Sequence, residues 1–390
     1  MLNFSQIFGF PIYLVGGAVR DHLLGIEVAD IDIASAVHPR DFKQHCKRLK
    51  IKSFDTGIEH GTITIIIDGV MYEHTTFRED VSTDGRNATV QFSKTIEEDL
   101  SRRDLTINAI ADLDGDLIDP FGGQEDLKNR LLRTVGNARD RFSEDYLRII
   151  RAARFGSRLS MTIDTDLLEA ARELGHQIPH FVSIERITDE FKKARLHGDA
   201  FLKVLKEMNL LEIILPYSAK LDQHQLHDWF IEVGRAGKLD MESYFTALFL
   251  PCGSKQEIEK QCRLFKLSNA LSKCIIQISS HFTTFRDQPV ALEDNIQIVR
   301  HCGDNYSRVL DFYQLVINDE LSTPAIDQAK AELGTIETAL KAPFVRGGEL
   351  NQLGIKPSPI FKELLDLALL RQIEGMSKET ILEELKQSLP

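Results

Sequence analysis

No hydrophobic run in this sequence approaches the roughly 18 uninterrupted apolar residues that a membrane-spanning helix needs. The five cysteines are odd in number and far apart, which argues against a disulfide framework and a zinc site and fits a reducing cytoplasm. The first residues carry neither a basic segment nor a small-residue cleavage motif, so we expect no signal peptide. These absences favour a cytoplasmic protein that has no membrane partner.

An excess of basic charge is also missing, because the formal net charge is −12. Taken alone, this charge argues against a nucleic-acid partner. Binding depends on a local basic surface, however, and the segment 128–158 holds nine Lys or Arg against three Asp or Glu. The sequence therefore predicts one phosphate-attracting region on an acidic protein.

The 390 residues exceed one ordinary domain, and the hydrophobic and charged shares of 43% and 27% are typical of a globular protein. Strand and helix signals alternate over the first 120 residues, and Asp68-Gly69 separates two β-branched runs in the manner of a hairpin. Residues 78–91 are polar and predict a mobile loop. Helical periodicity dominates after Gly123. We expect an α+β fold, a mixed-sheet head followed by an all-helical remainder.

A glycine pair lies between the first apolar run and the first helix signal. Gly16 and Gly17 have no Cβ, so their backbone N–H groups can approach a triphosphate at the start of that helix. The glycine spacing matches neither the dinucleotide-binding fingerprint nor the P-loop. Asp30 and Asp32 follow on one strand and face the same side, where two acids repel each other unless cations neutralise them. Oxygen-seeking Mg²⁺ suits such a pair, and a two-metal site can activate a hydroxyl and stabilise a leaving oxygen.

The segment 14–25, followed by Asp30-Ile-Asp32, resembles the active-site motif of class II tRNA nucleotidyltransferases, the bacterial CCA-adding enzymes of the DNA polymerase β superfamily. The resemblance implies a nucleotidyltransferase head in which Asp30 and Asp32 are catalytic and hold Mg²⁺. It adds Arg20 as a nucleotide-binding candidate. The superfamily commonly uses a third carboxylate from a neighbouring strand, for which Glu73 is the candidate; an exposed strand acid is the alternative interpretation of Glu73.

The segment Ser101-Arg-Arg-Asp-Leu-Thr-Ile-Asn-Ala resembles the second motif of the family, with Leu105 in place of Phe. Guanidinium groups bind phosphate oxygens bidentately. In the family this motif is associated with the triphosphate and with the choice of ribose. The resemblance therefore implies nucleotide-binding roles for Arg103, Asp104 and Asn108, where Asp104 orients an arginine or a ribose hydroxyl.

The segment Ser143-Glu-Asp-Tyr-Leu-Arg predicts a helix with Ser143 as its N-cap. Asp145 and Arg148, three residues apart, would share a helix face, and such a pair can read the edge of a nucleobase. The segment matches the E-D-x-x-R motif with which the family reads incoming CTP and ATP. The resemblance implies that Asp145 and Arg148 read the base, while Arg151 and Arg154 hold phosphate or RNA.

Two further segments resemble family motifs without carrying chemistry. Residues 119–127 resemble the third motif, a turn that couples the head to the helices. Residues 183–191 resemble the fifth motif, a supporting helix within which Glu185 and Arg186 are expected to pair. The resemblance implies three parts, which are a nucleotidyltransferase head, a helical neck with the base-reading helix, and a helical body and tail that binds tRNA, over residues 1–135, 136–215 and 216–390.

The implied function is addition of C, C and A to the 3′ end of tRNA from CTP and ATP by a monomer or homodimer. A bacterial poly(A) polymerase is one alternative, although the stretch 56–64 is closer to the CCA type and the tail is not basic. A partial enzyme that adds only CC or only A is another, because Asn87-Ala88 stands where relatives often have Arg-Pro. A catalytically dead RNA-binding or nucleotide-sensing protein is the alternative outside the enzymes; both aspartates argue against it.

Overall fold

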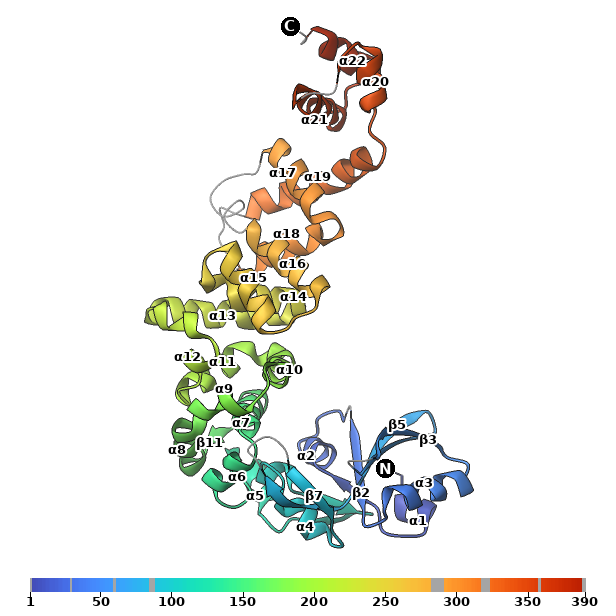
Figure 1. Ribbon diagram of the computed structural model, residues 1–390, viewed down its shortest axis with the longest axis vertical. Helices are drawn as coiled ribbons and strands as arrows, with labels where there is room; N and C mark the ends of the chain where they lie inside the picture. The colour runs from blue at the N-terminus through green and yellow to red at the C-terminus, as the bar shows by residue number, and fades with distance from the viewer. Residues whose placement is uncertain are drawn as a thin grey trace. The chain divides into compact units, whose positions relative to one another are not determined.

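The computed structural model describes residues 2–28, 30–58, 61–83, 88–281, 291–316, 323–356 and 359–387. The chain forms two compact units, Met1–Phe230 and Ile231–Pro390, and each is described by itself (Figure 1). Within the described ranges, no helix is both long enough and apolar enough to cross a lipid bilayer.

A seven-stranded mixed sheet forms the first part of the N-terminal unit, in the order β3-β4-β5-β2-β1-β8-β9. The strands β2 and β5 pair in parallel, and the other neighbours in this sheet pair antiparallel. The strands are β1 (Tyr13–Val15), β2 (Ile31–Ser35), β3 (Lys52–Gly57), β4 (Thr62–Ile67), β5 (Val70–Thr76), β8 (Ala111–Leu113) and β9 (Asp116–Ile118).

The predicted hairpin at Asp68-Gly69 is confirmed. Both turn residues have positive φ, 52° at Asp68 and 81° at Gly69, as a two-residue type I′ turn requires. The turn joins β4 to β5 in register from Ile67↔Val70 to Thr62↔Thr75. Because β5 also pairs with β2, this local turn places Glu73 on the strand next to the paired aspartates.

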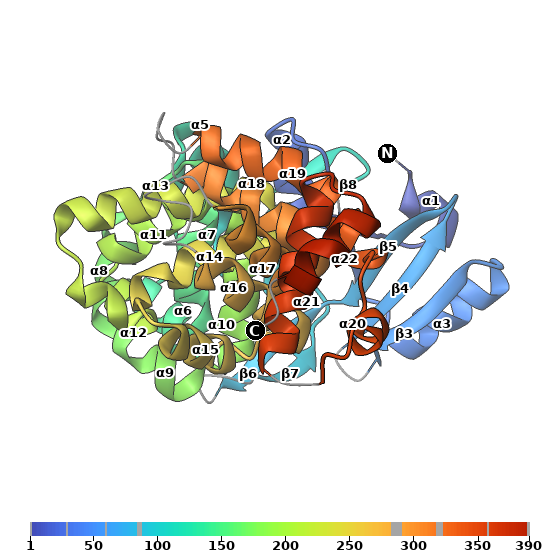
Figure 2. The ribbon, with the colours of Figure 1, turned by 90° about the horizontal axis from the view of Figure 1, so that it is seen from above.

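Five helices accompany the sheet and its connections. They are α1 (Phe4–Phe8), α2 (Gly17–Leu23), α3 (Pro39–Arg48), α4 (Ile96–Ser101) and α5 (Gly123–Asn129). Helix α3 lies along β3 and β4 (Figure 2). It buries Phe42, whose ring stacks on the imidazole of His74 from β5 with 3.5 Å between centroids. Burial lowers the pKa of His74 to about 3, so this histidine is a neutral core residue at physiological pH.

The prediction of a loop is wrong for residues 78–83 and 88–91, which form strands, and residues 84–87 lie outside the described residues. Strands β6 (Arg78–Thr83) and β7 (Ala88–Phe92) pair antiparallel in a separate two-stranded sheet. Thr and Val favour extended backbone, and pairing between the two strands satisfies backbone hydrogen-bonding groups. Asn87, on which the distinction between complete and partial addition depended, lies outside the described residues.

The remainder of the N-terminal unit is mainly helical. Its helices are α6 (Ala138–Glu144), α7 (Leu147–Leu159), α8 (Thr165–Leu174), α9 (Ile178–Phe181), α10 (Ile184–Ala194), α11 (Gly198–Glu207) and α12 (Leu211–Ile214). Strand β10 (Leu131–Leu132) precedes α6, and strand β11 (Thr162–Ile163) follows α7. The two strands pair in parallel. Helix α13 (Gln223–Leu239) crosses the boundary between the units.

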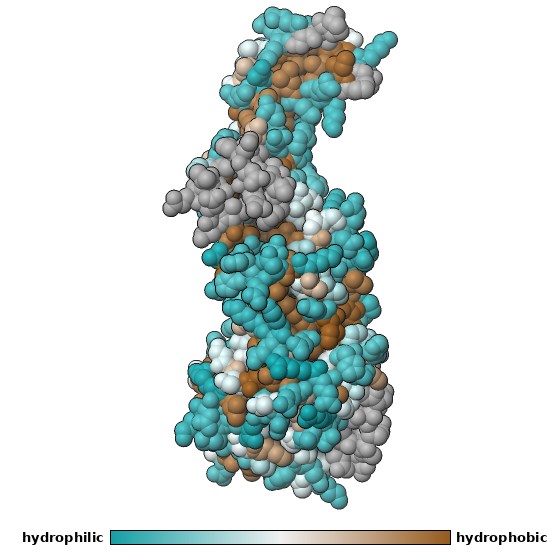
Figure 3. Space-filling view, turned by 90° about the vertical axis from the view of Figure 1, so that its left-hand side faces the viewer, coloured by the Kyte–Doolittle hydropathy of each residue, from teal (hydrophilic) through white to brown (hydrophobic). Residues whose placement is uncertain are grey.

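The C-terminal unit contains helices and no strand among its described residues, which confirms the predicted fold class. Its further helices are α14 (Met241–Phe249), α15 (Lys255–Leu264), α16 (Asn269–Ser280), α17 (Leu292–Cys302), α18 (Tyr306–Val316), α19 (Thr323–Lys341), α20 (Gly347–Gln352), α21 (Pro359–Ile373) and α22 (Lys378–Gln387). The last three pack around Leu350, Leu364 and Ile381. On the face shown in Figure 3, patches of hydrophobic residues lie between hydrophilic ones, including one patch on these last helices.

Candidate active site

The turn between β1 and α2 requires glycine at position 16 for two reasons. Gly16 has φ 67° and ψ −126°, a combination that only glycine adopts readily. A Cβ at this position would lie 2.5 Å from Nη1 of Arg103 and 3.9 Å from Oδ2 of Asp32. The backbone of the glycine turn, a guanidinium and a carboxylate therefore meet at one point.

Three carboxylates lie at adjoining positions of the sheet. Asp32 on β2 stands directly opposite Glu73 on β5 in the parallel register, and Asp30 precedes β2 by one residue. Burial raises the pKa of Asp32 to about 6, and the charges of Glu73 and Asp30 add to the rise while Arg103 opposes it. Among the described residues, these three carboxylates are not arranged as a ready-made group of three metal ligands.

Arg103 is held in place by a buried acid that the sequence interpretation missed. Asp99 on α4 accepts from Nη2 of Arg103 at 3.2 Å and from Nε and Nη2 of Arg102 at 3.1 and 2.8 Å. Burial raises the pKa of Asp99, but the charges of both arginines more than offset this, and the net pKa lies below its usual value. Asp99 precedes the arginines by three and four residues, so helical spacing could have identified this pairing.

Asp104 and Asn108 belong to a buried network. The Oδ1 atom of Asp104 accepts from the backbone N of Leu105 and from Nδ2 of Asn108, and Oδ2 accepts from Nε of Arg151 at 2.8 Å. Burial raises the pKa of Asp104, but Arg151 and Asn108 outweigh it and hold the pKa well below its usual range. Asp104 was expected to orient either an arginine or a ribose hydroxyl, and its contacts show that it orients Arg151.

Arg20 continues this network instead of facing solvent. Its Nη1 donates to Oδ1 of Asn108 at 2.6 Å and its Nε to Oδ1 of Asp21 at 2.8 Å, and the residue is 3% exposed. Arg158 donates to Oδ2 of Asp21 at 3.1 Å. A connected series of hydrogen bonds thus joins α2, the segment after α4 and α7; in order, its members are Arg158, Asp21, Arg20, Asn108, Asp104 and Arg151.

The prediction of one helix starting at Ser143 is wrong. Asn137 caps α6 by accepting from two backbone N–H groups, and Ser143 lies inside that helix. Asp145 is extended, with φ −156° and ψ 105°, and separates α6 from α7. Its Oδ1 accepts from the backbone N of Leu147 at 3.1 Å, as a cap at the start of α7 would. Glu144 and Asp145 are residues that favour the start of a helix, but α7 begins only after Asp145.

Asp145 therefore lies before the helix that carries Arg148, so the two candidates do not share one helix face as predicted. The carboxylate of Asp145 accepts hydrogen bonds from both terminal nitrogens of Arg186 on α10, at 3.2 and 2.7 Å. Arg148 forms an ion pair with Glu144 and donates to the carbonyl oxygen of Arg102 at 3.1 Å. Arg186, which was expected to pair with Glu185 within its own helix, orients Asp145 from 41 residues away.

Arg154, predicted to contact phosphate or RNA, is buried in an ion pair within the protein. Its side chain is 7% exposed and its Nε lies 2.5 Å from Oε2 of Glu190, which is 3% exposed. Three guanidiniums surround the ring of Phe155, those of Arg20, Arg151 and Arg154, at 4.9, 5.6 and 4.1 Å from its centroid. Cation–π contacts of this kind hold the arginines against α7.

The linking turn at 119–127 has a definite structural role. Both oxygens of Asp119 accept from the first backbone N–H groups of α5, those of Gly123 and Gln124, at 2.8 Å each. A Cβ at position 123 would overlap the carbonyl oxygen of Thr106. The glycine lets α5 pack directly against the segment that carries Asp104 and Asn108.

Residues 12–133 match the family model described as the poly A polymerase head domain, and residues 160–221 match the probable RNA and SrmB-binding site of polymerase A. A CCA-adding enzyme of Lactobacillus helveticus is 36% identical over 347 residues, which are 88% of this chain and 82% of the relative. A CCA-adding enzyme of Bacillus cereus is 37% identical over 375 residues, 92% and 88% of the two chains. The chain belongs to the CCA-adding enzyme family.

The fold of the CCA-adding enzymes extends over the whole chain. The crystal structure of the Bacillus stearothermophilus CCA-adding enzyme in complex with CTP aligns with a TM-score of 0.78 at 29% identity, over 99% of this chain and 97% of that one. The family that the motifs resembled is thereby confirmed. The motif residues lie in the matched head and in the helices that follow it.

Replacement of Gly16 with Ala should disrupt the CCA-adding site through Arg103. The new Cβ strains the backbone by about 1–3 kcal/mol and displaces the guanidinium. We expect nucleotide incorporation to fall at least about tenfold, with a raised KM for the nucleotide. Gly25→Ala is the matched control, because Gly25 also has positive φ, 66°, but nothing lies within 4 Å of its added Cβ. Equal losses in the two variants would contradict a role for the Arg103 contact.

Proposed function

We propose that this protein adds C, C and A to the 3′ end of tRNA from CTP and ATP, with release of pyrophosphate. The observation that carries the proposal is the register of Asp32 beside Glu73, with Arg103 held against the glycine turn. This arrangement places carboxylates that can bind metal ions next to a guanidinium that can bind phosphate. Membership in the CCA-adding family supplies the substrate class. The five cysteines are all free thiols, in keeping with the reducing cytoplasm proposed as its location.

The carboxylates fit hard divalent cations because they offer only oxygen ligands. Burial, with the charges of Glu73 and Asp30, raises the pKa of Asp32, and a bound cation would offset this cost of keeping it ionised. We assign Asp30 and Asp32, with Glu73 as the third carboxylate, to Mg²⁺, which would lower the pKa of the attacking hydroxyl and stabilise the leaving oxygen. The terminal hydroxyl of tRNA attacks the α-phosphorus of the nucleotide, and the bond to the bridging oxygen breaks. Gly16, Gly17 and Arg103 lie where the triphosphate would be held.

Asp145 and Arg148 remain the proposed base-reading residues, with a third residue added. Arg186 fixes the orientation of the Asp145 carboxylate, whose remaining lone pairs can accept from a base amino group. Arg148 is positioned by Glu144 and by the backbone of Arg102, which ties base reading to the arginine motif of the head. Arg20, Asp104, Asn108, Arg151 and Arg154 act behind these groups as positioning residues.

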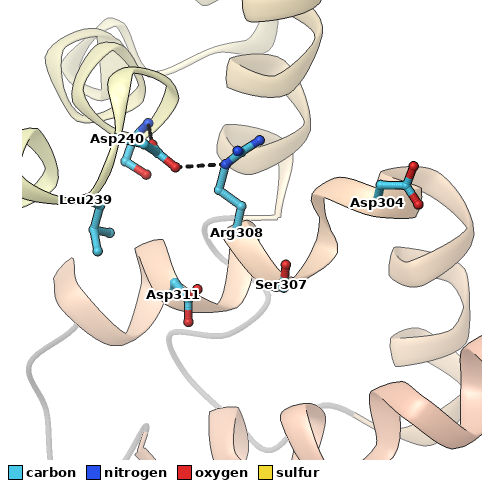
Figure 4. Close-up of a pocket in the computed structure, with 7 residues that line it drawn as sticks. Leu239, Asp240, Asp304, Ser307, Arg308 and Asp311 are labelled. Carbon is cyan, nitrogen blue, oxygen red and sulfur yellow. Dashed lines mark hydrogen bonds and ion pairs between the residues drawn. The ribbon is translucent and has the colours of Figure 1, made fainter.

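The proposed parts are a head over 1–135, a neck over 136–215 and a tRNA-binding body and tail over 216–390. In the last part, a polar pocket of about 340 Å³ is lined by Asp240, Asp304, Asp311 and Arg308 among others (Figure 4). Nε of Arg308 lies 2.8 Å from Oδ2 of Asp240, so the one arginine is neutralised and carboxylates dominate. Such a pocket repels phosphate, and we place the tRNA backbone elsewhere on this unit.

A tRNA transcript that ends at the discriminator base tests the function. Incubated with Mg²⁺ and both CTP and ATP, it should grow by three nucleotides, and with CTP alone by two. Growth that stops after two with both nucleotides, addition of A alone, or long A-tails would replace the proposal with a partial enzyme or a poly(A) polymerase. No growth at all would favour the non-enzyme alternative. Asp30→Ala is the matched negative control and should add nothing.

Replacement of Asp145 with Ala should reduce the choice between C and A more than the rate of addition. A carboxylate that accepts from a base contributes about 1–3 kcal/mol of discrimination, so the preference for the correct nucleotide should fall about tenfold. The ratio of kcat/KM for CTP and ATP on a tRNA ending at the discriminator base measures this. Asp189→Ala removes an exposed acid of α10 and should leave the ratio unchanged. An unaltered ratio in the Asp145 variant would exclude it from base reading.

A further inference from the structure

Three metal-binding side chains meet in the C-terminal unit. His281 follows α16, and His301 and Cys302 are the last two residues of α17. One ligand atom from each lies within 4.8 Å of the other two, and in the described ranges no other His, Cys, Asp or Glu residues form such a group. The cysteine spacing predicted no zinc site, because the histidines that accompany Cys302 are recognisable only in three dimensions. Imidazole nitrogen and thiolate sulfur are the preferred ligands of Zn²⁺.

The two imidazoles are already in contact. Nε2 of His281 and Nδ1 of His301 lie 2.9 Å apart, and the rings meet edge to face with 71° between their planes. In this pair one ring nitrogen donates its proton to the lone pair of the other. Two nitrogens bound to a tetrahedral Zn²⁺ stand about 3.3 Å apart, so a small outward shift of either ring would admit an ion.

The backbone around these ligands is fixed by buried side chains. Gln277, 3% exposed, donates from Nε2 to the carbonyl oxygen of His301 at 2.6 Å and accepts from Nδ2 of Asn305 at 2.9 Å. Tyr313 donates from its hydroxyl to the carbonyl oxygen of Ile278 at 2.7 Å. The end of α16 and the end of α17 are therefore held together independently of any ion, and the ligand positions are preorganised.

Burial of the ligands is graded across the cluster. Cys302 is 4% exposed, His281 is half-buried and His301 is exposed, so sulfur approaches from the interior and imidazole from the surface. Among the described residues no fourth side chain joins the group, which leaves a position for water. An ion bound here would exchange with solvent.

We propose that His281, His301 and Cys302 bind one Zn²⁺ ion, which fastens the end of α16 to the end of α17. Binding forms two nitrogen–zinc bonds and one sulfur–zinc bond. The shared imidazole proton moves to the other nitrogen of its own ring, and the Cys302 thiol releases its proton to water, so about one proton leaves per ion. The site is separate from the carboxylates proposed to hold Mg²⁺ and does not depend on the proposed function.

The test is a titration of the full chain, freed of metal with a chelator, with Co²⁺ as a spectroscopic substitute for Zn²⁺. We expect thiolate-to-cobalt charge-transfer absorption and tetrahedral d–d bands that saturate at one equivalent and disappear when Zn²⁺ displaces the cobalt. Carboxylate sites do not produce the thiolate band, so binding at the head is distinguished. His301→Ala, a change at an exposed residue, should weaken binding by at least about 100-fold without unfolding the protein.

Two further variants complete the test. Cys302→Ser should abolish the charge-transfer band, and its circular dichroism shows whether it folds. Cys262→Ser is the matched control, because Cys262 is equally buried, in α15 of the same unit, and should leave the titration unchanged. Absence of the thiolate band in the parent protein, or a titration unaffected by His301→Ala, would overturn the proposal.

Discussion

Replacement of Asp32 with Asn is expected to abolish nucleotide addition and to stabilise the metal-free protein. Loss of a charged ligand removes several kcal/mol of transition-state stabilisation, so kcat should fall at least about 1000-fold. Stability should change in the opposite direction, because burial and the charges of Glu73 and Asp30 raise the pKa of Asp32 to about 6. A carboxylate whose pKa is higher in the folded state destabilises the fold whenever it is charged.

The sign of this effect fixes its pH dependence. Above about pH 6 the carboxylate of Asp32 is ionised in both states and the variant should have its full advantage in unfolding free energy; below the unfolded pKa, near 4, the advantage should vanish. Urea unfolding in the presence of a chelator at pH 4 and pH 7.5 measures it. Asp55→Asn, at an exposed head acid paired with Lys43, is the control and should leave addition intact. Full activity in the Asp32 variant would contradict the proposed metal site.

Replacement of Glu190 with Leu should cause the largest loss of stability. It leaves the guanidinium of Arg154 buried without its carboxylate, and breaking a buried ion pair from one side costs about 3–5 kcal/mol. The stability is lost because a charge is buried without a partner, so removing both charges should recover most of the unfolding free energy. Combined with Arg154→Met, the Leu variant should approach the unfolding free energy of the parent. Chemical denaturation of the three proteins measures this.

The same pair of variants distinguishes structure from substrate contact at Arg154. A stable double variant that still adds nucleotides would establish Arg154 as a support for α7, whereas a stable but inactive one would restore its expected contact with phosphate or RNA. Lys193→Ala is the matched control. Lys193 also approaches Glu190, at 3.6 Å, but is 59% exposed, so its loss should cost less than about 1 kcal/mol.

Local features of the sequence predicted local structure. The turn at Asp68-Gly69 was recoverable because a type I′ turn needs positive φ at two adjacent residues. The break at Asp145 was not, because Glu144 and Asp145 suit the first turn of a helix as well as they suit a cap before one. The pairing of β6 with β7 was missed because the alternation of apolar and polar residues is confined to Ala88–Phe92, whereas residues 78–83 are polar apart from Val81.

Contacts between distant residues limited what could be predicted of the site. The motifs named Asp104, Arg151 and Asn108, but their partners lie far away in the chain: Arg151 meets Asp104 across 47 residues and Arg20 meets Asn108 across 88. Asp145 was expected to share a helix face with Arg148, but it lies before α7 and accepts hydrogen bonds from Arg186. Helical spacing identifies neighbours within one element, whereas the choice of partner between elements is decided by packing.

The hydrogen-bonded series from Arg158 to Arg151 has a consequence for hybrid proteins. Its acids and amide lie at positions 21, 104 and 108, and two of its arginines lie at 151 and 158. A chimera in which the head comes from one parent and everything after residue 130 from another would divide these partners between the two. Exchanged heads should therefore function only when the donor and the recipient carry complementary charges at both ends of the series.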